Sequence, residues 1–96
     1  MISREDFIFT IGYDGSTAIV DGQAKRRYSS LSTQELAERG MFRAAYSSAL
    51  RSGKNEEIDL VVSAYNACAH TNLTRESPLG RLFGVFNIDS KKAKVL

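Results

Sequence analysis

Residues 7–20 read FIFTIGYDGSTAIV, and this stretch decides the expected fold. Apolar and aromatic side chains recur at every second position, as they do on one face of a β-strand: Phe7, Phe9, Ile11 and Tyr13. The Asp14-Gly15 pair that follows is a strong hairpin signal, because a type I′ turn needs positive φ at both central residues. A hairpin centred on this pair places Ile11 opposite Ala18 and Phe9 opposite Val20, so that one apolar face continues across both strands.

A second Asp-Gly pair, Asp21-Gly22, follows seven residues after the first. The spacing suggests a third strand over residues 24–28, which would make the hairpin a three-stranded meander. Lys25 would then share a face with Ala18, and an inward-facing charge is typical of an edge strand. We therefore expect either an edge strand or an extended loop here.

The next segment carries clear signals for the start of a helix. Ser32 and Glu35 have the spacing of a capping box, and Leu31 and Leu36 that of a hydrophobic staple. Gly40 leaves two interpretations: a glycine inside the helix, costing about 1 kcal/mol relative to alanine, or the left-handed end of a short helix. We favour a break, with a second helix that continues through residue 51 and stops near residue 53.

A further helix is predicted after Asn55, which is a suitable capping residue. Between residues 58 and 69 apolar side chains surround a narrow polar stripe, which indicates a core-facing helix; the stripe consists of Asp59, Ser63, Asn66 and His70. Cys68 is predicted to be a small buried residue. The link over residues 52–55 is short, so this helix and the one before it should form an antiparallel pair.

The C-terminal third is expected to return to the sheet. Residues 71–77 are predicted to be a loop, followed by a turn or a single helical turn at Pro78. Residues 82–88 are rich in aromatic and β-branched side chains, which favours a strand. The predicted architecture is therefore α+β: an N-terminal hairpin or meander, an antiparallel helix pair and a C-terminal strand. It forms one domain over residues 1–90, with a mobile basic tail at residues 91–96.

Composition bounds the class of protein. The chain has 96 residues, of which 43% are hydrophobic and 25% charged, which suits one small globular domain. The single cysteine excludes an intramolecular disulfide, and the acidic N-terminal residues do not resemble a secretory signal. The longest stretch without a charged residue, Leu60 to Thr74, is too short to span a membrane. We expect a cytoplasmic protein with no membrane partner.

No complete catalytic set is recognisable. Cys68 and His70 stand two positions apart, so they would point to opposite sides of a helix and could not act as a nucleophile–base pair. One cysteine and one histidine cannot supply an ordinary structural zinc site, and no phosphate-binding glycine loop is present. The sequence therefore favours a protein without catalytic activity and predicts no metal or cofactor.

Three hypotheses for function remain. The first is a protein-interaction or regulatory module that binds a protein partner or itself, through an apolar surface formed by Phe83, Val85, Phe86 and Ile88. The second is a nucleic-acid-binding protein that contacts a polyanion through Lys25, Arg26, Arg27, Tyr28, Lys91, Lys92 and Lys94. The third is a ligand-binding protein or small enzyme, which a pocket lined by convergent polar groups would support. For the basic segments of the second hypothesis, the simplest interpretation is a solvated surface.

Charge is unevenly distributed along the chain. The net charge is +2, but the six basic residues at positions 25–27, 91, 92 and 94 account for more than this excess. The rest of the chain carries seven basic and eleven acidic residues, a net charge of −4. A nucleic-acid role therefore depends on whether these two segments lie together in the fold. A further basic stripe, formed by Arg39, Arg43 and Arg51, requires a helix that runs unbroken through Gly40.

Overall fold

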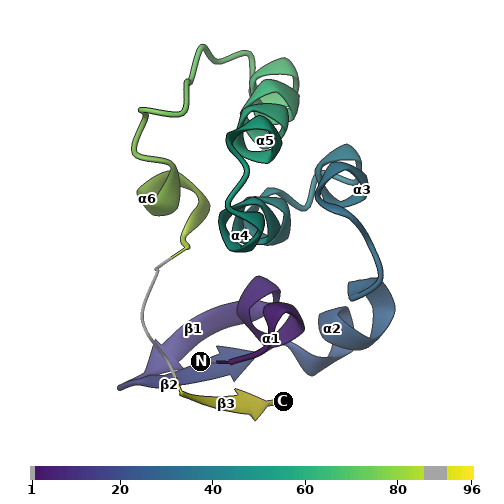
Figure 1. The fold of residues 1–96 in the computed structure, drawn as a ribbon, viewed down its shortest axis with the longest axis vertical. Coiled ribbons are helices and arrows are strands. Elements are labelled where there is room, and N and C mark those ends of the chain that lie inside the picture. The colour runs from purple at the N-terminus through teal and green to yellow at the C-terminus, as the bar shows by residue number, and fades with distance from the viewer. Residues whose placement is uncertain (1, 86–90) are drawn as a thin grey trace. The chain divides into compact units, whose positions relative to one another are not determined.

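The computed structural model describes residues 2–85 and 91–96 (Figure 1). The chain forms two compact units. The sheet unit comprises Met1–Ser30 and Asn87–Leu96, and the helical unit comprises Leu31–Phe86. The α+β class with a hairpin and a returning C-terminal strand is confirmed.

The sheet unit contains a three-stranded mixed sheet of order β1-β2-β3 and two short helices. Its elements are α1 (Arg4–Ile8), β1 (Thr10–Asp14), β2 (Thr17–Val20), α2 (Gly22–Tyr28) and β3 (Lys92–Val95). Strands β1 and β2 are antiparallel, whereas β2 and β3 run parallel. The parallel pairing of β3 makes the sheet mixed, so a simple meander does not describe it.

The predicted hairpin is present, but its first strand starts at Thr10 and not at residue 7. Ser3 caps α1 by accepting a hydrogen bond from the Asp6 N–H. Phe7, Ile8 and Phe9 are all buried, which a short helix and its C-cap achieve, whereas a strand with one apolar face would expose the middle residue. The period-two pattern therefore belongs only partly to a strand.

The register of the hairpin also differs from the prediction. The turn residues are Gly15 and Ser16, so Tyr13 rather than Ile11 lies opposite Ala18. Gly15 has φ +62° at the first turn position, where a type II′ turn requires glycine. An irregularity between Thr10 and Gly12 leaves Ile11 without a place in the register, and its side chain is 48% exposed.

Residues 24–28 are helical, so the prediction of an edge strand or loop there is wrong. Asp21 caps α2, since its Oδ1 accepts from the Ala24 N–H at 3.1 Å. The second Asp-Gly pair thus starts a helix instead of closing a hairpin. Alanine, lysine and arginine, which follow, are strong helix formers, and this preference decides the segment.

The helical unit contains α3 (Thr33–Glu38), α4 (Phe42–Ser52), α5 (Asn55–Ala69) and α6 (Leu79–Phe83). The capping box of Ser32 and Glu35 is confirmed. Gly40 ends α3 with φ +75°, the Gly40 N–H bonds to the Ala37 oxygen, and the Met41 N–H bonds to the Leu36 oxygen, as in a Schellman motif. The predicted break at Gly40 and the stop at Gly53, which has φ +70°, are both confirmed.

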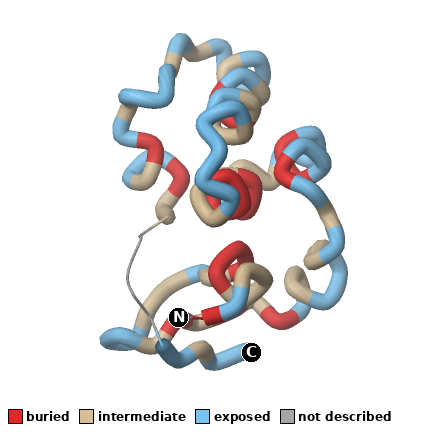
Figure 2. The backbone as a smooth tube through the Cα atoms, viewed as in Figure 1, coloured by how far each residue is buried: buried red, intermediate tan, exposed pale blue. Residues whose placement is uncertain are grey.

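Small side chains line the buried face of α4, where α3 and α5 pack against it. Ala45 and Ala49 are fully buried, as are Leu36 of α3 and Val61 of α5 (Figure 2). The short link between α4 and α5 is confirmed. Asn55, predicted as the cap of α5, is its first helical residue instead, and the capping position is occupied by Lys54.

The C-terminal third departs most from the sequence prediction. Residues 82 and 83 belong to α6, which Gly84 ends with φ +70°, so the strand predicted over residues 82–88 is wrong at its start. Residues 86–88 lie outside the described part of the chain. The returning strand is β3, in the segment expected to be a basic tail: it pairs with β2 from Thr17↔Lys92 to Val20↔Val95. That pairing supplies backbone hydrogen bonds that a free tail would lack.

Candidate functional site

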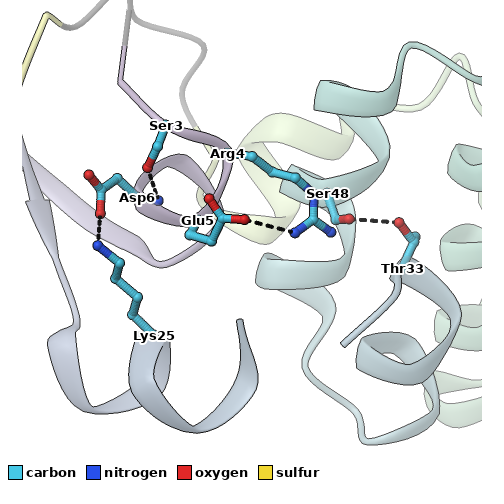
Figure 3. Close-up of polar contacts among 7 residues, drawn as sticks. All are labelled: Ser3, Arg4, Glu5, Asp6, Lys25, Thr33 and Ser48. Carbon is cyan, nitrogen blue, oxygen red and sulfur yellow. Dashed lines mark hydrogen bonds and ion pairs between the residues drawn. The ribbon is translucent and has the colours of Figure 1, made fainter. Parts of the chain in front are cut away.

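The basic run of α2 divides into one residue with an internal partner and two exposed residues. The Lys25 Nζ lies 2.6 Å from the Asp6 Oδ1 of α1 (Figure 3). Arg26 and Arg27 are exposed, and Tyr28 is half-buried at the end of the helix. Lys25 therefore ties α2 to α1, while the two arginines remain accessible to a partner.

Two of the three lysines of the C-terminal segment lie on one face of β3. Lys92 lies opposite Thr17 and Lys94 opposite Ile19, so both lysines share the face that these two β2 residues occupy. Ala18 and Val20, on the other face of β2, are fully buried. Lys91, Lys92 and Lys94 are all exposed. The strand pairing thus fixes two of the three lysines in position.

The fold brings the start of α2 against the end of β3. Gly22 is buried, and a Cβ atom added to it would clash with the Leu96 carbonyl oxygen and come within 2.9 Å of the Val95 Cγ1. The Arg26 Nη1 would lie 3.3 Å from the same added atom. The Arg26 guanidinium therefore lies near the residues that directly follow Lys94.

Several carboxylates of the sheet unit have partners inside it. Asp6 pairs with Lys25, and Glu5 lies 3.8 Å from the Arg4 Nη1 (Figure 3). Asp21 caps α2. These contacts compensate acidic charge close to α2. We call the five exposed basic residues of this unit the basic surface: Arg26, Arg27, Lys91, Lys92 and Lys94.

The predicted apolar interface includes a residue that the structure buries. Phe83 is only 8% exposed, because its ring packs in an aromatic cluster with Tyr65 (centroids 5.2 Å apart), Tyr46 (5.3 Å) and Phe42 (6.4 Å). Val85 is half-buried, and Phe86 and Ile88 lie outside the described residues. Phe83 is therefore a core residue of the helical unit and cannot serve as an exposed contact.

The arginine stripe does not form. Gly40 separates Arg39, the C-cap of α3, from Arg43 and Arg51 of α4. The Arg43 Nε also donates to the Phe83 carbonyl oxygen at 3.3 Å, which ties α4 to the end of α6. The geometry that would have made a basic stripe is lost at the break.

Cys68 and His70 show no catalytic arrangement. Cys68 is exposed, so the prediction of a buried cysteine is wrong; it lies on the last turns of α5, where the residues from 67 to 70 are all exposed. His70 ends α5 with φ +56°, a left-handed conformation uncommon outside glycine. Within the described residues, no group of three His, Cys, Asp or Glu side chains is placed to hold a metal ion.

A cleft beside α5 was not predicted from the sequence. Three of the four residues of the predicted polar stripe of α5 face the loop that follows the helix, and together they line a cleft of about 370 Å³. The one hint of it in the sequence was Asn66, because an asparagine side chain can form hydrogen bonds with the backbone of a neighbouring loop. Its side chain makes three hydrogen bonds to two loop residues, Thr71 and Leu73, which lie five and seven residues further on, beyond the range of helix periodicity.

No protein-family model, curated protein or solved structure matches this chain. Among the described residues, no helix is both long enough and apolar enough to cross a lipid bilayer.

Proposed function

We propose that the sheet unit binds nucleic acid through the phosphate backbone, using the basic surface. The observation that supports this best is the contact between the start of α2 and the end of β3 at Gly22. Two basic segments more than sixty residues apart in sequence therefore belong to one small unit. This was the condition on which the nucleic-acid hypothesis depended.

The charge balance of the two units favours the sheet unit as the one that binds a polyanion. It carries seven basic and five acidic residues, whereas the helical unit carries six of each. Asp6 and Asp21 are engaged within the unit, which leaves fewer acidic groups to oppose the exposed arginines and lysines. Contacts from such side chains to phosphates are independent of base sequence.

This function accounts for the observations better than the apolar-interface hypothesis. The interface hypothesis relies on exposed members of its four apolar residues. Of the two that the structure describes, Phe83 is buried in the aromatic cluster and Val85 is half-buried. The polyanion hypothesis requires exposed cations, and Arg26, Arg27 and Lys94 are exposed. Lys25 contributes by holding α2 in place rather than by contacting phosphate, since its ammonium is bound to Asp6.

Binding of a fluorescently labelled single-stranded DNA oligonucleotide, measured by anisotropy over a range of salt concentrations, tests the proposal. Five phosphate contacts, one for each residue of the basic surface, predict that log K falls against log salt with a slope of about −3.5, at roughly 0.7 per contact. Replacing Arg26 and Arg27 by alanine should weaken binding and make that slope shallower by about 1.4.

The matched control removes two exposed arginines of the helical unit, Arg39 and Arg81. The two double variants lose the same charge, so only the location differs. The control should keep the wild-type slope. Absence of binding at low salt, or an equal loss in both double variants, would refute the proposal.

A further inference from the structure

We propose that the cleft between α5 and the loop at residues 71–77 binds a small organic cation, an alkylammonium or alkylguanidinium group. This site lies in the helical unit and is independent of the basic surface. Its lining combines polar groups with two apolar side chains: Asp59, Val62, Ser63, Asn66, Leu73, Thr74, Arg75 and Glu76.

The cleft exists because the chain turns back along α5. His70 takes a left-handed conformation with φ +56°, which ends the helix and reverses the chain. Asn66 then fixes the loop: its Oδ1 accepts from the Thr71 hydroxyl at 2.7 Å and from the Leu73 N–H at 3.0 Å, and its Nδ2 donates to the Leu73 oxygen at 2.9 Å. The loop wall is thus held in place without a ligand, which lowers the entropic cost of binding one.

The charges that line the cleft select the sign of the ligand. Asp59 and Glu76 contribute two carboxylates, and Arg75 contributes one guanidinium. The Arg75 Nε lies 3.2 Å from the Asp59 Oδ1, but both side chains are about half exposed, at 41% and 55%. Such exposed ion pairs are weak, so a cation that enters the cleft can compete with Arg75 for Asp59. The net negative charge of the lining favours a cation over an anion.

The apolar part of the lining selects the shape of the ligand. Val62 is buried and Leu73 is half-buried, and both contribute to the cleft. A short alkyl chain can lie on these side chains while its charged end reaches a carboxylate, as lysine and arginine side chains do on protein surfaces. A volume of about 370 Å³ accommodates such a group.

Titration of the full chain with n-butylguanidinium, followed by amide chemical shifts, tests the site. We expect saturable shifts at Ser63, Asn66 and Thr74, and no saturable shift with butyrate, which has a similar alkyl chain and the opposite charge. A parallel titration with a capped Gly-Arg-Gly peptide separates the two sources of the cation: binding of the peptide indicates an arginine side chain of a partner, and binding of the free cation alone indicates a small molecule.

Two kinds of variant make the assignment specific. Glu76→Gln and Asp59→Asn should each weaken binding by about fivefold, whereas Glu38→Gln, an exposed carboxylate on α3, should leave it unchanged. Ser63→Leu keeps every charge and fills the cleft from an exposed helical position, so it should abolish binding while the spectrum remains that of the folded protein. Equal responses to butylguanidinium and butyrate, or full binding by Ser63→Leu, would overturn the proposal.

Discussion

The Thr33 Oγ1 lies 2.7 Å from the Ser48 Oγ inside the helical unit, and both residues are buried (Figure 3). The Thr33 hydroxyl donates its proton to the Glu57 Oε1. A hydroxyl has only one proton, so Ser48 must donate to Thr33. The resulting chain of hydrogen bonds runs from α4 through α3 to α5 and connects the three helices at one point.

Removing the first donor of this chain should destabilise the protein. Ser48→Ala leaves a buried Thr33 oxygen without its donor, which costs about 1–2 kcal/mol in the free energy of unfolding. Urea denaturation measures the change. Ser63→Ala, an exposed serine on α5, should alter the stability by less than about 0.5 kcal/mol. Equal effects of the two substitutions would show that the buried chain contributes nothing to stability.

The helix boundaries near this network were predictable because their signals are local. Ser32 and Glu35 satisfy each other's backbone donors within four residues, and Gly40 bonds to Ala37 only three residues away. The bond between Thr33 and Glu57 was not predictable, because it joins residues 24 positions apart that meet only after three helices have packed. Local sequence predicts the ends of helices better than it predicts which polar groups they bury together.

Gly40 provides the second stability test. Its φ of +75° is accessible to glycine at little cost, but strains a residue that carries a Cβ. Gly40→Ala should therefore lower the free energy of unfolding by about 1 kcal/mol. Asparagine tolerates the left-handed region better, so Gly40→Asn should cost less than Gly40→Ala in the same urea denaturation series. A reversed order would contradict the assigned role of the left-handed conformation.

The basic surface illustrates why the candidate site was only partly predictable. The sequence identified its residues by charge, but it assigned α2 to a strand or loop, and β3 to a tail. Asp21-Gly22 suits both a hairpin turn and a helix cap, and the choice follows from the helix-forming residues after it. Strand β3 has a single strongly β-favouring residue, Val95, and forms because β2 offers it an unpaired edge. That edge is more than seventy residues away in sequence.

Gly22 tests the contact that brings the two basic segments together. Gly22→Ala places a methyl group against the Leu96 carbonyl oxygen and 2.9 Å from the Val95 Cγ1, so the end of β3 must move. The Leu96 N–H donates to the Val20 oxygen at 3.0 Å, and amide hydrogen exchange at Leu96 should become faster in the variant. We expect a loss of about 1–3 kcal/mol in stability. Gly12→Ala is the matched control, because its added Cβ meets nothing within 4 Å; it should leave the exchange rate at Leu96 unchanged.

Ionisation of Tyr46 should lower the free energy of unfolding at alkaline pH. Its ring packs against Phe83 in the aromatic cluster, and burial raises the pKa of Tyr46 above its ordinary value of 10.0. The unfolded chain loses this proton first, so the folded state has its full stability below about pH 10 and loses it as the pH rises through the higher folded pKa. Tyr46→Phe should reduce the difference in the free energy of unfolding between pH 8 and pH 11. Burial also raises the pKa of Tyr13, so adding Tyr13→Phe should reduce the difference further. An unchanged pH dependence in the double variant would show that groups other than these two tyrosines cause the alkaline loss.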